Sequence, residues 1–135
     1  MANVHRVLLA EDNKINQVVA AGALKKLGYV VDIVDGGGDA VAACLHARFD
    51  AVLMDVMMPD MDGYEATSRI RENEAALGTS PVPVIGLSAR AMAGDREIAL
   101  AAGMDDYLTK PFSAEQLIDV LTRCLPPVTD NAVSA

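Results

Sequence analysis

Five side chains that could bind a metal ion or a phosphoryl group stand directly after apolar runs of the sequence. Asp55 ends the run 51–54 within the stretch AVLMDVMMPDMDG, residues 51–63. A carboxylate beside a buried strand costs free energy unless a cation, a proton or hydrogen bonds compensate it. Comparable residues follow three further apolar runs, namely Glu11 and Asp12 after 7–10, Ser88 after 84–87, and Lys110 after 107–109.

Together these residues predict phosphoryl-transfer chemistry. Singly, each has a plainer interpretation, because acidic residues at strand–helix junctions are usually helix caps, and single serines or lysines are usually turn or solvated residues. Clustered carboxylates, however, repel each other by about 4 kcal/mol per pair at roughly 4 Å and an effective dielectric of about 20. Mg²⁺ would relieve this repulsion, since it binds a few carboxylates together with waters and a phosphate oxygen. We therefore expect Asp55 as the nucleophile, Lys110 as a point charge and Ser88 as a donor to a phosphoryl oxygen.

These side chains meet only if the strands are parallel, and the sequence predicts such a sheet. Apolar runs alternate with amphipathic segments, which is typical of a parallel sheet covered by helices on both faces. Binding sites in such sheets lie at the carboxyl ends of the strands. Asp60 and Asp62 are expected to be only turn and cap groups, and Gly36–Gly38 a flexible turn. Strands are expected at 7–10, 30–34, 51–54, 84–87 and 107–109, and helices at 14–27, 39–47, 62–74, 94–102 and 113–125.

Composition argues against several other classes of protein. The chain has 135 residues, of which 52% are hydrophobic, as in one compact domain. No apolar run reaches the length of a membrane span, and residues 1–6 lack the features of a signal peptide, so we expect a cytoplasmic protein. The net charge of −8 argues against direct binding to nucleic acid. Cys44 and Cys124 are expected to be buried free thiols.

Four motifs carry a resemblance to a known family: Leu9–Asn13 (LAEDN), Met54–Gly63 (MDVMMPDMDG), Leu87–Ala89 (LSA) and Thr109–Pro111 (TKP). Over residues 6–125 the sequence resembles the receiver, or phosphoacceptor, domain of two-component response regulators. A closer resemblance, to the receivers of hybrid histidine kinases, rests on Glu11–Asn13 with Asn16 and Gln17, and on residues 91–97 and 102–108. The resemblance implies a flavodoxin-like, doubly wound, five-stranded parallel sheet of order 2-1-3-4-5 with five helices. The departures are mild: Glu11 stands where Asp is commoner, Ser88 where Thr is also common, and Arg90 where Asn is frequent.

The resemblance also implies a role for each site residue. Asp55 takes a phosphoryl group from a phosphohistidine of a histidine kinase or a histidine phosphotransfer domain, and Lys110 and Ser88 bind the phosphoryl oxygens. Ser88 and Tyr107 then act as a switch that reshapes the surface of the fourth helix, fifth strand and fifth helix for a downstream protein target. The Lys110–Pro111 peptide bond is commonly cis in this family. The implied ligands of Mg²⁺ are the carboxylates of Glu11, Asp12 and Asp55 and the backbone carbonyl of Met57.

Met57 and Arg90 are expected to flank the mouth of the site and to set the lifetime of the phosphorylated form. Met57 offers an attacking water no polar partner, and Arg90 is long enough to cover the mouth or to approach a phosphoryl oxygen. The alternative for Arg90 is a solvated side chain in the loop before the fourth helix. An aspartate-nucleophile phosphatase is the main alternative, but it would want a second acid where Met57 stands. A flavin carrier would require a phosphate-binding loop where Glu11 and Asp12 stand. A pure interaction module would need neither the three acids nor Ser88 and Lys110 at one edge of the sheet. The chain is therefore expected to promote only its own phosphotransfer and dephosphorylation.

Residues 1–125 are expected to form the receiver domain, and the Pro-led residues 126–135 a flexible tail or the start of a linker. His5 and His46 lack the setting of a phosphodonor, so the chain is expected to receive phosphoryl groups rather than to originate them. The sequence leaves open whether the chain is a stand-alone regulator or the receiver of a larger hybrid kinase.

Overall fold

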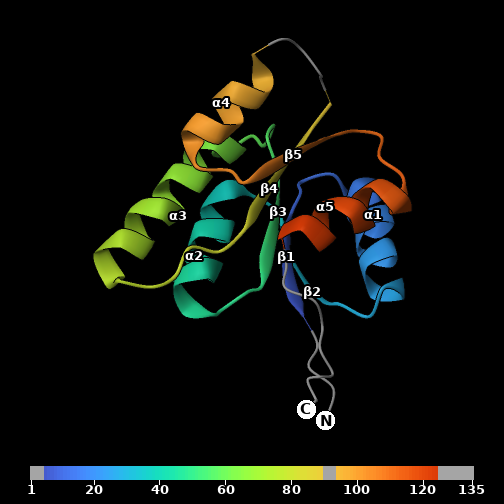
Figure 1. The fold of residues 1–135 in the computed structure, drawn as a ribbon, viewed down its shortest axis with the longest axis horizontal. Coiled ribbons are helices and arrows are strands. Elements are labelled where there is room, and N and C mark those ends of the chain that lie inside the picture. The colour runs from blue at the N-terminus through green and yellow to red at the C-terminus, as the bar shows by residue number, and fades with distance from the viewer. Residues whose placement is uncertain (1–4, 90–93, 125–135) are drawn as a thin grey trace.

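The computed structural model describes residues 5–89 and 94–124, which form a central parallel sheet between two layers of helices (Figure 1). The strand order is β2-β1-β3-β4-β5, which confirms the predicted fold. The strands are β1 (Arg6–Ala10), β2 (Val30–Val34), β3 (Ala51–Asp55), β4 (Val84–Ser88) and β5 (Asp106–Thr109). The helices are α1 (Lys14–Lys26), α2 (Gly37–His46), α3 (Gly63–Leu77), α4 (Asp95–Ala102) and α5 (Ala114–Cys124).

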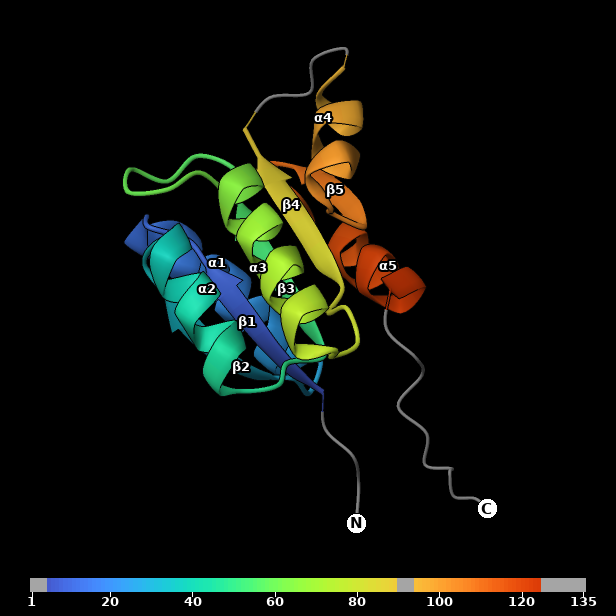
Figure 2. The same ribbon diagram turned by 90° about the vertical axis from the view of Figure 1, so that its left-hand side faces the viewer.

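The central strands are buried on both faces, and this divides the core into two clusters. Successive side chains of a strand point to opposite faces, so Leu9 packs in the cluster with α1 and α5, whereas Leu8 packs in the cluster with α2, α3 and α4. Figures 1 and 2 show the same division, with α1 and α5 on one face of the sheet and the other three helices on the opposite face. All residues of β3 and β4 are buried, which explains their unbroken apolar character.

Asp62 and Ser113 are the helix caps that their capping-box patterns predict, and Asn13 is a cap that was not predicted. Asn13 caps α1 by accepting a hydrogen bond from the amide of Asn16, and Asp62 caps α3 by accepting one from the amide of Glu65. Ser113 and Gln116 form a reciprocal capping box ahead of α5. The end of α3 differs from the prediction: the helix continues beyond residue 74 to Leu77 and ends at Gly78, whose φ of 71° suits a glycine.

The prediction of a flexible turn at Gly36–Gly38 is wrong. Helix α2 begins at Gly37, two residues earlier than expected, and Gly36 is its N-cap. The three glycines lie against the loop after β3, and a Cβ at Gly37 would overlap the carbonyl oxygen of Met61. Sequence reasoning treated these glycines as a source of flexibility, whereas their role is to let the backbone come close to that loop.

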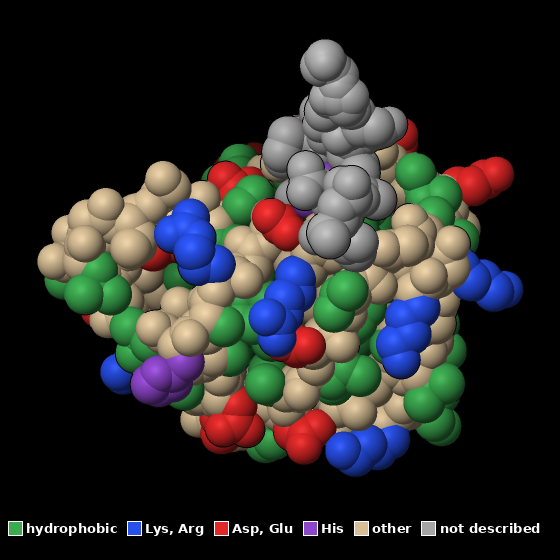
Figure 3. Space-filling model, turned by 90° about the horizontal axis from the view of Figure 1, so that it is seen from below, with side chains coloured by type: hydrophobic (Ala, Val, Ile, Leu, Met, Phe, Trp, Pro, Cys, Tyr) green, Lys and Arg blue, Asp and Glu red, His purple; other side chains and the backbone are tan. Residues whose placement is uncertain are grey.

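Three expectations from composition can be compared with the structure. Cys44 and Cys124 are both free and half-buried, and burial raises the pKa of the Cys44 thiol to about 11. No helix in residues 5–89 and 94–124 is both long enough and apolar enough to cross a bilayer. On the face that Figure 3 presents, lysine and arginine side chains are separated by acidic and hydrophobic ones instead of forming a basic stripe.

Candidate functional site

The structure brings the predicted site residues together at the carboxyl edge of the sheet, the upper edge in Figure 2. Glu11 and Asp12 follow β1, Asp55 and Ser88 are the last residues of β3 and β4, and Lys110 follows β5. Parallel pairing of the four strands sets these ends side by side, with Ala10 opposite Met54, Asp55 opposite Leu87, and Ser88 opposite Thr109.

Three carboxylates form a compact acidic cluster. Glu11, Asp12 and Asp55 each offer an oxygen, and these oxygens all lie within 4.8 Å of one another. Glu11 and Asp55 are only 2% and 4% exposed, whereas Asp12 is exposed. Mg²⁺ prefers carboxylate oxygens and keeps several waters, so two buried ligands and one at the surface fit this ion well.

Lys110 is the cation that partly neutralises the cluster. Its Nζ lies 2.8 Å from Oε1 of Glu11 and 3.1 Å from Oδ2 of Asp55. Burial disfavours the charged ammonium, but hydrogen bonds to these two carboxylates outweigh burial and raise the pKa of Lys110. The ammonium is therefore charged at neutral pH and stands where a point charge can meet a phosphoryl oxygen.

The two buried carboxyls differ in their affinity for a proton. Burial, helped by the hydrogen bond with Glu11, raises the pKa of Asp55 to about 6, against the opposing effect of Lys110. For Glu11, burial acts upward too, but hydrogen bonds from Lys110, from Asp55 and from the Asn13 amide hold its pKa below the ordinary range. As pH falls, Asp55 is thus the first of the pair to take up a proton.

Glu11 is held by a residue to which sequence reasoning gave no role. The buried side chain of Gln17 donates through Nε2 to the carbonyl oxygen of Glu11 at 2.5 Å and to Oδ1 of Asp35 at 2.6 Å. The amide of Asn13 donates to Oε2 of Glu11 at 3.2 Å. The sequence signals were the resemblance of Asn16 and Gln17 to hybrid-kinase receivers and the place of Gln17 one turn after Asn13, on the buried face of α1.

Asp55 is held by the loop that follows it. The Met57 amide donates to Oδ1 of Asp55 at 3.2 Å, and the Val56 amide donates to the carbonyl oxygen of Leu87 at 2.9 Å. A Cβ at Gly63 would overlap the carbonyl oxygen of Asp55, so only glycine allows α3 to begin this close to the strand. The Met57 side chain is 71% exposed, which puts an apolar group at the surface two residues beyond Asp55.

The remaining predicted residues lie on the β4–β5 side of the site. Ser88 is buried, and its carbonyl oxygen accepts a hydrogen bond of 2.6 Å from the Lys110 amide. The Lys110–Pro111 peptide bond is cis. The half-buried Tyr107 has its hydroxyl 3.5 Å from Oδ2 of Asp95 at the start of α4. Arg90 lies outside the described residues.

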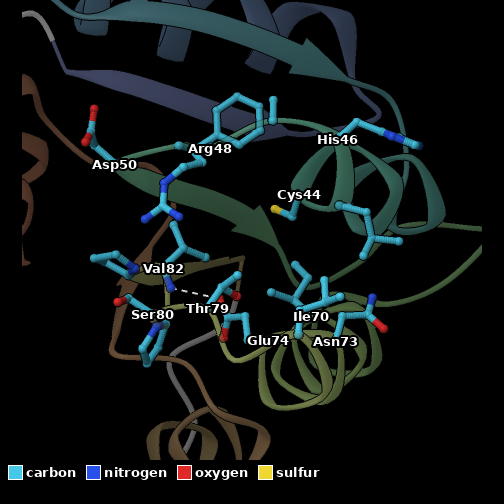
Figure 4. Close-up of a pocket in the computed structure, with 16 residues that line it drawn as sticks. Cys44, His46, Arg48, Asp50, Ile70, Asn73, Glu74, Thr79, Ser80 and Val82 are labelled. Carbon is cyan, nitrogen blue, oxygen red and sulfur yellow. Dashed lines mark hydrogen bonds between the residues drawn. The ribbon is translucent and has the colours of Figure 1, made fainter.

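A groove lies at the opposite, amino edge of the sheet. This groove has a volume of about 440 Å³ and runs between the ends of α2 and α3 and the starts of β3 and β4 (Figure 4). His46 and Arg48 are among its lining residues, and His5 pairs with Asp50 at the same edge, with Nδ1 and Oδ2 3.6 Å apart. Both histidines are therefore separated from the acidic cluster by the length of the sheet.

Comparison with known proteins relates the whole fold to one family. The sequence model of the response regulator receiver domain matches residues 7–122. Sensor protein GacS of Pseudomonas syringae pv. syringae is 46% identical over 118 residues, covering 87% of this chain and 13% of that protein. Hybrid signal transduction histidine kinase I of Dictyostelium discoideum is 40% identical over 136 residues, covering 96% of this chain and 8% of that protein. The chain thus spans only a small part of the length of these curated relatives.

Two solved structures are similar over nearly the whole chain. The receiver domain of sensor histidine kinase PA1611 from Pseudomonas aeruginosa, crystallised with a magnesium ion coordinated in its active-site cleft, is 43% identical with a TM-score of 0.79, covering 90% of this chain and 98% of that one. A chain of the co-crystal of the Saccharomyces cerevisiae histidine phosphotransfer protein Ypd1 with the receiver domain of Ssk1 is 28% identical with a TM-score of 0.86, covering 99% and 95%.

Proposed function

The chain belongs to the family of response regulator receiver domains, and we propose that its Asp55 accepts a phosphoryl group from a phosphohistidine of a partner protein. One observation carries the proposal: a buried aspartate at a strand end lies within reach of two further carboxylates and of the Lys110 ammonium. This combination binds a divalent cation and a phosphoryl group at once. The donor is a histidine kinase or a histidine phosphotransfer domain.

Each site residue has its own role in the proposed phosphoryl transfer. Glu11, Asp12, Asp55 and the Met57 carbonyl would hold Mg²⁺, which neutralises charge on the nucleophile and the transferring group. A carboxylate oxygen of Asp55 forms the new P–O bond while the P–N bond of the phosphohistidine breaks, and the imidazole nitrogen keeps the electron pair and takes a proton from solvent. Lys110 pairs with a phosphoryl oxygen and Ser88 donates a hydrogen bond to another. Because Asp55 must be ionised to attack, Mg²⁺ bound to its carboxylate would also favour the reactive, ionised form.

An apolar patch on α1 supports the docking of a protein partner beside the site. Ile15, Val18 and Val19 are 74%, 73% and 62% exposed, an unusual concentration for one helix. A cavity of about 450 Å³ reaches from Val19 to Lys110 and Phe112, and Glu11 is part of its lining. A helix that carries the donor histidine could cover this patch and present its imidazole to Asp55, as would suit a partner of the phosphotransfer type seen with the Ssk1 receiver.

The output of phosphorylation is the surface formed by α4, β5 and α5. We assign Ser88 and Tyr107 as the switch that connects the phosphoryl group to this surface. Ile98, Leu100 and Ile118 on α4 and α5 are 52%, 47% and 39% exposed, which suits contact with a downstream protein target. The aspartate-nucleophile phosphatase remains disfavoured, since an exposed methionine and no acid stands two residues after Asp55.

Two further proposals concern the extent of the domain and its location in the cell. We propose a receiver domain at residues 1–125 and a tail or linker at 126–135, which lies outside the described residues. We also propose a cytoplasmic location and no enzymatic activity on other substrates.

Phosphorylation by a small phosphodonor tests the proposed function. Wild-type protein incubated with acetyl phosphate and Mg²⁺ should gain one phosphoryl group, which intact mass spectrometry detects. Asp55→Asn keeps the shape of the side chain and removes the nucleophile, so this variant should stay unlabelled. Labelling of Asp55→Asn at the wild-type level would refute Asp55 as the acceptor.

A further inference from the structure

Helix α2 receives its N-terminal cap from the loop of the phosphoacceptor. A helix N-cap residue normally offers a side-chain oxygen to the first-turn amides, but the N-cap of α2 is Gly36 and provides none. The amides of Gly37 and Gly38 donate instead to the carboxylate of Asp60, over 3.2 Å to Oδ1 and 3.0 Å to Oδ2. Asp60 lies five residues after Asp55, so these bonds join α2 to the site.

The glycines at the start of α2 are fitted to this loop. A Cβ at Gly36 would lie 2.6 Å from Oδ1 of Asp60, and a Cβ at Gly38 would lie 3.3 Å from Oδ2. A Cβ at Gly37 would overlap the carbonyl oxygen of Met61. A side chain at any of these positions would therefore press on the loop, most severely at Gly36 and Gly37.

Backbone hydrogen bonds hold the two ends of the same loop. At one end the Val56 amide donates to the carbonyl oxygen of Leu87, and at the other the Gly63 amide donates to the carbonyl oxygen of Val56, each over 2.9 Å. Between these ends the Met58 side chain is buried in the core, whereas the exposed side chain of Met57 gives its own backbone little packing. The Asp60 bonds to α2 thus add a polar attachment to the middle of the loop, beside the packing of Met58 and Met61. Helix α2 is itself anchored, because Ala40 is fully buried in the core.

We propose that Asp60 is a positioning residue for the magnesium and phosphoryl site. Its carboxylate latches the loop 56–62 to α2 and so holds the Met57 carbonyl and the Met57 amide at the places where they serve Mg²⁺ and Asp55. This inference rests on the proposed function, since it concerns the geometry of the same site. Outer groups that orient metal ligands typically change metal affinity by about 10- to 100-fold when removed.

Asp60→Ala tests the latch directly. In the metal-free protein the amides of Met57 and Gly63 should exchange with solvent faster than in the wild type, as followed by NMR. Titration calorimetry should find Mg²⁺ affinity lowered by about tenfold. Asp39→Ala is the matched control, because it removes the same charge from the first turn of α2 and leaves the Asp60 bonds in place; neither exchange nor affinity should change in it.

A double variant separates positioning from simple helix capping. Gly36 has extended backbone angles that serine also adopts, and its nearest clashes are with Asp60. Gly36→Ser combined with Asp60→Ala should therefore cap α2 locally without rejoining the loop. We expect the Tm to recover towards wild type while Mg²⁺ affinity and loop exchange stay at the Asp60→Ala level. Recovery of Mg²⁺ affinity would overturn the proposal and leave Asp60 as a cap alone.

The two readouts also distinguish failure of the latch from failure of the proposed function. A wild-type protein that binds no Mg²⁺ would contradict the magnesium site, and amide exchange in the metal-free protein would then decide the latch. Wild-type exchange rates at Met57 and Gly63 in Asp60→Ala would overturn the latch whether or not Mg²⁺ binds.

Discussion

Replacing the phosphoacceptor by its neutral isostere should stabilise the metal-free fold, and increasingly so as pH rises. Asp55 is buried beside Glu11, and its pKa in the folded protein is raised to about 6. The folded state therefore binds this proton more tightly than the unfolded state, so stability falls as pH rises. Asp55→Asn removes this effect and keeps an oxygen that can accept from Lys110.

The size of the effect follows from the pKa shift. The pKa moves from the model-peptide value of 3.8 to about 6 on folding, and a difference of about two units corresponds to about 3 kcal/mol. The wild-type penalty is absent below pH 4, grows between pH 4 and 6, and is complete above pH 6. Asp55→Asn should thus gain up to about 3 kcal/mol in free energy of unfolding at pH 7 and almost nothing at pH 4.

Urea unfolding from pH 4 to pH 8 in the presence of a chelator measures this difference. Asp39→Asn serves as the control, because it removes an exposed carboxylate outside the cluster and should change stability little at any pH. Mg²⁺ added at 100 times its dissociation constant should stabilise the wild type by about 2.7 kcal/mol and Asp55→Asn much less. A gain in Asp55→Asn that is the same at pH 4 and pH 8 would refute the reasoning, because it would not come from the ionised carboxylate.

Three further predictions concern the metal, the switch and the lifetime. Asp12→Asn should lower both Mg²⁺ affinity and the rate of phosphorylation, and equal binding of divalent ions by calorimetry would make Asp12 a cap rather than a ligand. Phosphorylation, or binding of a beryllofluoride mimic, should shift amide NMR signals around Tyr107, and a response confined to the surroundings of Asp55 would contradict a switch. Arg90→Ala and Met57→Asn should each shorten the half-life of the phosphorylated form after the donor is removed, and unchanged or longer half-lives in both would leave these residues without a role in hydrolysis.

Features that depend on pattern and topology could be predicted from the sequence. The alternation of apolar runs with amphipathic segments predicted a sheet covered by helices on both faces, because a buried parallel strand must be apolar on both faces. The site followed from one geometric fact, that the carboxyl ends of parallel strands share an edge. The caps Asp62 and Ser113 could be predicted because a cap bonds to amides only two or three residues away.

Contacts between distant segments could not be predicted in this way. Asp60 bonds to amides 22 and 23 residues earlier in the chain, and a single sequence gives no distance between such segments. The prediction of a flexible turn at Gly36–Gly38 was wrong for the same reason, since glycine permits both flexibility and close backbone approach. Gln17 was missed because a polar residue on a helix usually faces solvent, and only the fold puts its amide beside Glu11.

The position of β5 explains why phosphorylation of Asp55 should change the surface formed by α4, β5 and α5. A ligand shifts an equilibrium only through contacts that differ between two states, and two groups expected to bind the phosphoryl oxygens are Ser88 and Lys110. The Lys110 amide bonds to the Ser88 carbonyl over 2.6 Å, so a movement of either residue pulls on the end of β5. β5 is an edge strand whose residues from Tyr107 onward are half-buried, whereas β3 and β4 are buried throughout. It can therefore move with less loss of packing than the central strands. The opposite edge strand, β2, is also partly exposed but contributes no predicted ligand of the phosphoryl group, so nothing at the site would drive it.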